Sequence, residues 1–371
     1  MNSRQRLQMA LACQTPDRVP ISTYELVGYD THLLENNDPS YARLMQAIRD
    51  KTDCMAMWNP GSNERFLCSS ANAAIETRQW RDGDRTISHS TLHAPKGDLT
   101  QTTVREDNLN TIWQTEHWCK TPQDVDVALS VPFEPVDYEV SDYARICSEL
   151  GDHGIVMASL GDPLLVAAEM MAFGDFTIWA ATETEHFART IDLLRERVME
   201  NLRRMLAVNV VDLYRICGPE YATPPFLPPA LFDRFVTPYV AEMTDVIHSK
   251  GGQVRLHCHG KIGRVLDMIL ATGADAIDPC EPPPDGDITL AEVKRRLNGR
   301  MCICGNMELK WLEHESEGEV DAHVKGCMDA AKAGGGYVIM PTAAPINSPL
   351  APKTECNYLR YIDAALEYGA Y

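Results

Sequence analysis

The sequence predicts a (β/α)8 barrel, an α/β fold in which parallel strands alternate with helices. Eight short apolar runs recur along the 371 residues, and each is followed by a stretch with helical spacing. Strands that alternate with helices pair in parallel, because each helix returns the chain to the same end of the sheet. Eight such units form a closed barrel, so the spacing predicts this architecture.

The predicted strands are the apolar runs themselves. In chain order they are Arg18–Ser22, Cys54–Trp58, Ile155–Leu160, Val210–Ile216, Gln253–Cys258, Ala274–Asp278, Met301–Cys304 and Tyr337–Met340. The clearest helix between them has one apolar face at three-and-four spacing, formed by Phe187, Ile191, Leu194, Val198, Leu202 and Met205. Another helix opens with a capping box, Thr289 to Glu292. These helices have the amphipathic character that packing against a sheet requires.

Residues 61–120 break the alternation, because they show little helical spacing. Asp82-Gly83 lies between runs of alternating polar and apolar residues, which indicates a β-hairpin. Pro95 to Asp98 indicates a second turn. We predict an antiparallel β insertion over residues 61–120, packed over one mouth of the barrel. Its own core would be small, so residues 1–371 are expected to form a single domain.

Composition narrows the class of protein. The formal charge of −19 argues against a general nucleic-acid or membrane-surface binder. No apolar run approaches the roughly 18 residues of a membrane span, and the first residues resemble an amphipathic helix more than a signal peptide. The twelve cysteines are scattered and form no CxxC pair, which is typical of core thiols in a reducing compartment. We therefore expect a cytoplasmic protein.

In barrels of this kind, catalytic residues lie on the loops that follow the strands. The polar residues at these positions are Glu25, Asp162, Glu220, Tyr221, His257, His259, Asp278, Glu281, Asn306, Glu308 and Thr342. A helix N-cap or a turn is the structural alternative for each, and we expect it for Asp162 and Glu308. For Glu220 and Glu281 we favour function, because prolines fix the loops around them.

The strand that ends in His257-Cys258-His259-Gly260 is the most informative segment. Side chains alternate along a strand, so His257 and His259 point the same way and Cys258 points to the opposite face. Two imidazoles at a strand end can bind a metal ion or act as an acid/base pair. The alternative is a pair of polar residues that only satisfy hydrogen bonds.

Several segments carry a family resemblance. They are Ser3 to Leu7, Thr15 to Pro20, Lys250 to Gly252, the strand ending in His257, Gly273 to Ala276, Gly305-Asn306 and Gly335 to Pro341. In this order they resemble the uroporphyrinogen decarboxylase (URO-D) superfamily, and its corrinoid-dependent methyltransferase branch is the nearer match. The resemblance spans the chain and implies the same (β/α)8 barrel.

The methyltransferase branch implies a zinc site and a corrinoid co-substrate. Its enzymes hold zinc with a His-x-Cys at the end of this strand and a Cys near the last strand. Here His257 matches the histidine, His259 replaces the first cysteine, and the second falls near Thr342 or Ala343. We expect Zn²⁺ bound by His257, His259 and a carboxylate, Glu281 or Glu220. The corrinoid would come from a partner protein, because no Asp-x-His-x-x-Gly segment is present.

The resemblance leaves more than one activity open. We predict methyl transfer to or from a corrinoid protein, with Glu25, Glu220, Tyr221 and Asn306 as catalytic residues and Asp162 and Thr342 as cofactor-binding residues. A decarboxylase or other lyase, in which Glu25, Glu220 and the histidines act as acid and base, is the second hypothesis. A tetrapyrrole- or corrinoid-binding module is the third. The arginine-rich segment of true uroporphyrinogen decarboxylases does not follow Pro20, so we predict no turnover of uroporphyrinogen.

Overall fold

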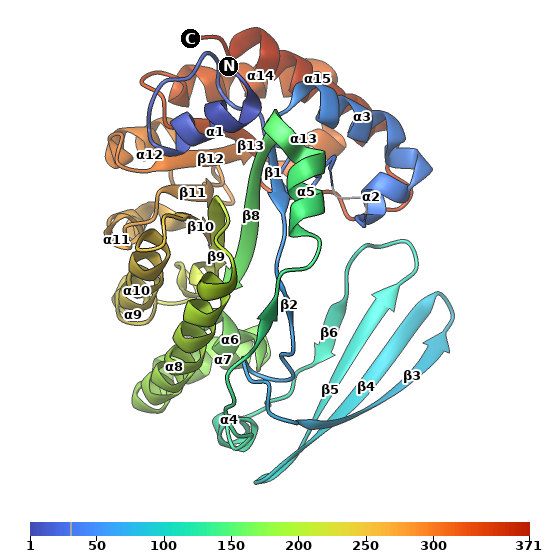
Figure 1. Ribbon diagram of the computed structural model, residues 1–371, viewed down its shortest axis with the longest axis vertical. Coiled ribbons are helices and arrows are strands. Elements are labelled where there is room, and N and C mark those ends of the chain that lie inside the picture. Colours follow the sequence, from blue (N-terminus) through green and yellow to red (C-terminus); the bar gives the residue numbers. More distant parts are fainter. Residues whose placement is uncertain (30–31) are drawn as a thin grey trace.

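The structure, a computed structural model, describes residues 1–29 and 32–371 and is built on a curled, all-parallel sheet (Figure 1). Seven strands follow one another in chain order across it. They are β1 (Cys54–Met57), β8 (Gly154–Gly161), β9 (Leu213–Cys217), β10 (Gln253–Cys258), β11 (Ala276–Pro279), β12 (Cys302–Met307) and β13 (Tyr337–Pro341). Each overlaps a strand that the sequence predicts, so the α/β class is confirmed.

The predicted first strand, Arg18–Ser22, was wrong. The sheet has seven strands within the described residues, and this segment contributes one isolated parallel bridge between Ile21 and Ile339. Pro20 has no N–H to donate, and the N–H of Ile21 donates to the Asp53 side chain instead of to a neighbouring strand. Two consecutive donors are therefore lost to the ladder. The segment still lies between the two edge strands, because the N–H of Asp53, just before β1, donates to the carbonyl of Ile21.

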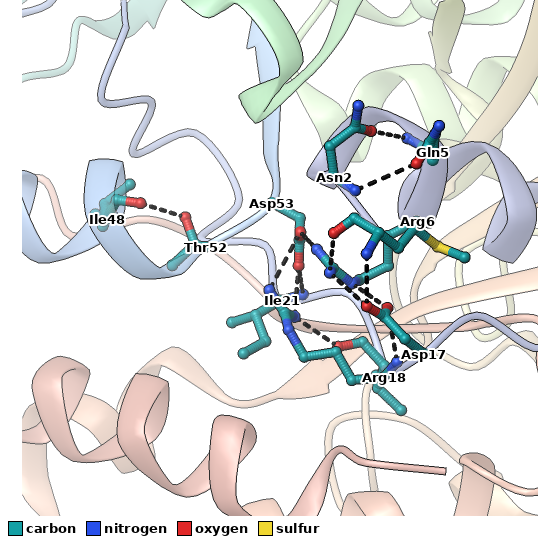
Figure 2. Close-up of polar contacts among 11 residues, drawn as sticks. Asn2, Gln5, Arg6, Asp17, Arg18, Ile21, Ile48, Thr52 and Asp53 are labelled. Carbon is teal, nitrogen blue, oxygen red and sulfur yellow. Dashed lines mark hydrogen bonds and ion pairs between the residues drawn. The ribbon is translucent and has the colours of Figure 1, made fainter.

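An ion-pair cluster fixes this segment at the amino-terminal end of the strands (Figure 2). Asp53 is fully buried and accepts from Arg6 Nη1 at 2.6 Å, from Arg18 Nη1 at 2.7 Å and from the N–H of Ile21 at 2.9 Å. Arg6 also donates from Nε to Asp17 at 2.7 Å. The opening residues that carry the family resemblance therefore stabilise the fold here through ion pairs.

Helices cover the outer face of the sheet (Figure 1). The α-helices are α1 (Ser3–Leu11), α2 (Leu34–Asn37), α3 (Ala42–Lys51), α4 (Pro122–Ala128), α5 (Tyr143–Leu150), α6 (Pro163–Glu169), α7 (Phe173–Thr182), α8 (Thr184–Val208), α9 (Pro229–Phe235), α10 (Thr237–His248), α11 (Leu266–Ala271), α12 (Leu290–Leu297), α13 (Leu309–His314), α14 (Glu317–Ala331) and α15 (Pro352–Tyr368). Short 3-10 turns cover Pro39–Tyr41, Gly151–His153, Pro219–Ala222 and Ile262–Arg264. None of the helices in the described ranges is long and apolar enough to cross a membrane.

The two faces of the sheet bury different side chains. Along β10, Val254, Leu256 and Cys258 join the large apolar cluster between sheet and helices, as predicted for Cys258. Arg255 and His257 alternate with them, and Arg255 Nη1 lies 3.2 Å from Met55 Sδ. Met55 belongs to a second cluster on the concave side of the sheet. All twelve cysteines are free and seven are buried, consistent with core thiols.

An antiparallel sheet follows β1, with the strand order β3 (Ala74–Asp82), β4 (Arg85–Ala94), β5 (Gly97–Glu106) and β6 (Trp113–Glu116). Both predicted turns are present, because β3 turns into β4 after Asp82 and β4 turns into β5 after Ala94. A separate pair joins β2 (Gly61–Ser62) to β7 (Tyr138–Glu139). Leu92 and Leu99 reach the main core, and the N–H of Asn110 donates to the carbonyl of Ile346 at 2.8 Å.

Candidate active site

His257, near the carboxyl end of β10, and His259, just after this strand, lie side by side. Their ring centroids are 4.5 Å apart and the rings are nearly perpendicular. His257 Nδ1 is 2.8 Å from Asp278 Oδ2, and His259 Nδ1 is 2.7 Å from Glu281 Oε1. Both carboxylates belong to the neighbouring β11 and the loop after it, so each imidazole has a carboxylate from the adjacent strand on one ring nitrogen. Nε2 is then the ring nitrogen left for a ligand or a proton.

His257 and Asp278 form the deeper of these pairs. Burial lowers the pKa of His257 and outweighs the opposing effect of the Asp278 carboxylate. Burial alone would raise the pKa of Asp278, but the charges of Arg255 and His257 hold it well below its ordinary value. Asp278 is therefore an anion and His257 is a neutral imidazole near pH 7. Asp278 Oδ1 also lies 3.0 Å from Arg255 Nε.

The outer pair behaves in the opposite way. Burial would lower the pKa of His259, but the hydrogen bond and charge of Glu281 raise it above its ordinary value. Burial likewise opposes the ionisation of Glu281, and His259 with the N–H of Gly260 lowers its pKa. The two imidazoles therefore differ in their affinity for a proton, although they are neighbours.

Two arginines that our sequence reasoning missed lie behind the histidines. Arg255 is fully buried, and Arg215, on β9, donates from Nη1 to Glu25 Oε1 at 2.8 Å and from Nη2 to the Tyr24 hydroxyl. The Glu25 side chain is about half exposed, at 51%. The signal was available, since both arginines alternate with apolar residues on strands whose other side chains are buried. The ion pair with Arg215 holds Glu25 at the site.

Glu220 and Tyr221 line a cavity beside His259. The cavity has a volume of about 460 Å³, and it is lined by Phe173, Glu220, Tyr221, Phe226, His259, Gly260, Glu281 and Asp285. Glu220 Oε2 accepts from the N–H of Gly218 at 2.8 Å. Two of the predicted catalytic residues thus share a cavity with one of the two histidines and with Glu281.

Asp162 and Glu308 are buried acids at the same end of the strands. Asp162 caps α6, because Oδ1 accepts from the N–H of Leu165 at 2.7 Å, as the structural interpretation predicts. Burial raises its pKa well above the ordinary value. Burial, with Glu281 and Asp285 nearby, raises the pKa of Glu308 to about 7 against the opposing charge of Lys310. Asp162 Oδ2 and Glu308 Oε1 have no hydrogen-bond partner within the described part of the chain.

The structure does not bring Asn306 and Thr342 into contact with the histidines. Asn306 Nδ2 donates to the carbonyl of Cys280 at 2.8 Å, and its Oδ1 accepts from the thiol of Cys327 on α14. Thr342 Oγ1 accepts from the N–H of Leu309 at 3.2 Å, at the start of α13. Their observed contacts are structural, and nothing in them indicates catalysis or cofactor binding.

The donor set fits a Zn²⁺ ion in part. The Nε2 atoms of His257 and His259 are suitable nitrogen ligands, because a carboxylate on Nδ1 is the usual support of a metal-binding histidine. Glu281 is not free to be a third ligand in this arrangement, since Oε1 contacts His259 and Oε2 accepts from the N–H of Gly260. Residues 1–29 and 32–371 contain no group of three or more His, Cys, Asp or Glu arranged to hold a metal ion. The nitrogen ligands that this site offers, within the described residues, are therefore those of His257 and His259.

The fold and the site together place the chain among α/β proteins with polar residues gathered at the carboxyl ends of parallel strands. Residues 111–355 match the family described as Uroporphyrinogen decarboxylase (URO-D), and the chain belongs to this family. A methyltransferase from Methanosarcina mazei has a similar fold along the full length of both chains, with a TM-score of 0.63, 18% identity and 99% of each chain covered.

Two sugar epimerases are more distant structural neighbours. A D-psicose 3-epimerase from Clostridium cellulolyticum H10, solved with D-tagatose, has a TM-score of 0.35 at 9% identity, with 62% of this chain and 84% of the epimerase covered. A D-psicose 3-epimerase solved in the presence of D-fructose has a TM-score of 0.28 at 11% identity, with 62% and 83% covered. No curated protein matches the sequence significantly.

Proposed function

We propose that this URO-D family member is a cytoplasmic enzyme that transfers a methyl group between a small molecule and a corrinoid carried by a partner protein. The observation that carries the proposal is the pair of imidazoles, His257 and His259, each supported by a carboxylate at Nδ1. Such support is typical of metal-binding histidines, and the fold is shared with a protein named as a methyltransferase. In this proposal, the curled sheet and the Pro20–Ser22 segment form one complete barrel, with the active site at the carboxyl ends of the parallel strands.

In this proposal, His257 and His259 hold a Zn²⁺ ion. A divalent ion bound there would supply Lewis-acid activation of the methyl donor or acceptor. Asp278 fixes the orientation of His257, and Arg255 keeps Asp278 ionised. Glu281 fixes His259 in the same way. The remaining mouth residues, Glu220 and Tyr221, line the adjacent cavity in which the small molecule would bind.

The first test is an activity assay in which the two histidines are substituted one at a time. Purified protein is incubated with methylcobalamin and candidate acceptors, and demethylation is followed in the visible spectrum. We expect the His257→Ala and His259→Ala variants to lose at least about a hundredfold in rate, because changing even the outer-shell partner of a metal ligand typically costs about 10- to 100-fold. His248→Ala is the matched control. His248 Nε2 lies 2.8 Å from Asp275 Oδ2, so it also pairs with a carboxylate, but it is not part of this site. Full activity in the double variant His257→Ala/His259→Ala would refute the proposal.

The second test is metal content. Protein purified without added metal is expected to hold about one equivalent of zinc, and the double histidine variant less than a tenth of that. Added Zn²⁺ at ~100-fold excess over its dissociation constant should stabilise the wild type by roughly 2.7 kcal/mol. Methyl transfer by a metal-free protein would keep the activity and remove the zinc from the proposal.

A decarboxylase or other lyase, acting on a carboxylated substrate other than uroporphyrinogen, is the second candidate. The observation that favours it is the buried Arg215, whose partner Glu25 is half exposed and could yield to a substrate carboxylate. Release of CO2 from a candidate acid without any corrinoid would favour this activity over methyl transfer. We expect uroporphyrinogen itself to remain unchanged, and turnover of that compound would contradict the expectation.

A further inference from the structure

The cavity beside His259 combines aromatic rings and carboxylates in one place. Phe173 and Phe226 are 39% and 45% exposed, their ring centroids are 4.6 Å apart, and the rings are perpendicular. Tyr221 stands next to Phe173, with centroids 5.8 Å apart. Three aromatic side chains therefore form one wall, and the exposed rings at right angles can contact a ligand on two sides.

The same cavity lining carries carboxylates. They belong to Glu220, Glu281 and Asp285. Glu281 is paired with His259 and Asp285 with Lys310, whereas Glu220 accepts only a backbone hydrogen bond among the described contacts. No arginine or lysine belongs to the lining within the described residues.

Two further acids, Asp162 and Glu308, interact with Glu220 and Glu281 of the lining, and their raised pKa values favour the uncharged form while no cation is near. Asp162 is fully buried and Glu308 is 6% exposed, and each has a carboxyl oxygen without a hydrogen-bond partner across the described ranges. The pKa of Glu169 is also raised, by burial and then by the charge of Glu220. A cation in the cavity would relieve this accumulation of carboxyl groups.

We propose that this cavity binds a methylated ammonium cation. A primary ammonium would need acceptors for its three N–H groups, which aromatic rings do not supply, and a neutral apolar ligand would gain nothing from the carboxylates. A quaternary ammonium group suits both, because it cannot donate hydrogen bonds and is attracted to aromatic faces and to negative charge. The volume of about 460 Å³ is in the range of small-ligand sites.

Resting on the proposed function, the same cation would be the methyl donor. The carbon–nitrogen bond breaks and its electron pair remains on nitrogen, which leaves as a neutral amine. The methyl carbon would be taken up by the reduced corrinoid of the partner protein, which would supply the electron pair of the new bond. The transfer needs no proton, so the cavity requires no acid beside the nitrogen.

Binding can be tested without any corrinoid. Calorimetric titration of the whole protein with choline is compared with 3,3-dimethylbutan-1-ol, its neutral isostere. We expect choline to bind about tenfold more tightly than the isostere, because only the cation gains from the rings and the carboxylates. Phe173→Leu and Phe226→Leu should each weaken choline binding about fivefold and leave the isostere unchanged. Trp113→Leu is the matched control, since Trp113 is also half exposed but lies on β6.

The outcomes separate this inference from the proposed function. Equal affinity for choline and the isostere, or no binding of choline at ~10 mM, would overturn the inference. Loss of choline binding in Trp113→Leu as well would also overturn it. Methyl transfer from a neutral donor by a protein that ignores choline would leave the proposed function standing and refute only the ligand class. Tight binding of choline without methyl transfer would support the ligand class and count against the proposed function.

Discussion

The two ends of the parallel sheet use the same kinds of side chain for different purposes. At the amino-terminal end, Asp53 accepts from two arginines and a backbone N–H, and both of its oxygens are used. At the carboxyl end, Asp162 and Glu308 keep oxygens without partners in the described chain. Carboxylates with both oxygens paired stabilise a fold, whereas buried acids with an unpaired oxygen and a raised pKa are typical of sites that bind or react. We therefore expect function at the carboxyl end of the sheet.

The largest effect is expected from Asp53→Ala at the amino-terminal end. Removing this carboxylate leaves Arg6, which is 6% exposed, without its buried partner and frees the N–H of Ile21. We expect the free energy of unfolding to fall by about 4 kcal/mol, measured by urea denaturation. Asp17→Ala is the control, because Asp17 is 43% exposed and should cost about 1 kcal/mol or less. A loss of about 1 kcal/mol or less in Asp53→Ala as well would show that the cluster contributes no more than exposed ion pairs do.

At the carboxyl end, Glu308→Gln should stabilise the protein. The pKa of Glu308 is raised to about 7, above the value near 4.3 of an unfolded glutamate. Its contribution to stability is therefore fully present below about pH 4 and is lost as the pH rises through 7. The amide cannot ionise, so the variant should gain about 2 kcal/mol over the wild type at pH 8 and little at pH 4. Equal free energies of unfolding for Glu308→Gln and the wild type at pH 8 would mean that the Glu308 carboxylate is solvated or paired.

A smaller effect is expected at Asp162. The amide oxygen of Asp162→Asn can still accept from the N–H of Leu165, and the carboxyl group resists ionisation because its pKa is raised. We therefore expect Asn to change the free energy of unfolding by less than about 0.5 kcal/mol, and Ala, which removes the helix cap, to cost about 1 kcal/mol. Denaturation curves of the two variants at pH 7 make the comparison. A large loss in Asn alone would mean that Asp162 is ionised and paired with a group outside the described contacts.

Most of the fold could be predicted from hydrophobic spacing, but the Arg18–Ser22 strand could not. Its apolar residues have the right pattern, and only the tertiary position of Asp53 shows that the N–H of Ile21 has another acceptor. The predicted hairpin turns of the antiparallel sheet were correct because turn residues act locally. The packing of that sheet over the mouth remains a prediction.

The candidate site was predictable where side-chain direction follows from the strand. His257 and His259 share a face, and Cys258 takes the other, as alternation requires. Asn306 and Thr342 were chosen for their position after a strand, but their direction depends on the loop conformation, and both contact the surrounding backbone or helices. Arg215 and Arg255 were missed because fully buried charged residues are uncommon, although both alternate with apolar residues on predicted strands.

The isolated bridge between Ile21 and Ile339, which is found in place of the predicted first strand, affects the order in which the chain folds. The N–H of Val19 donates to the carbonyl of Gly369, and the Tyr361 hydroxyl donates to the carbonyls of Ser22 and Ile339. Contacts between residues so far apart in the sequence carry a large loop-closure cost and form late. During synthesis, the segment around Ile21 can pair with Asp53 early, but its contacts with Ile339, Tyr361 and Gly369 must wait until those residues have been made. A nascent chain stalled earlier would expose this apolar segment to chaperones or to other chains.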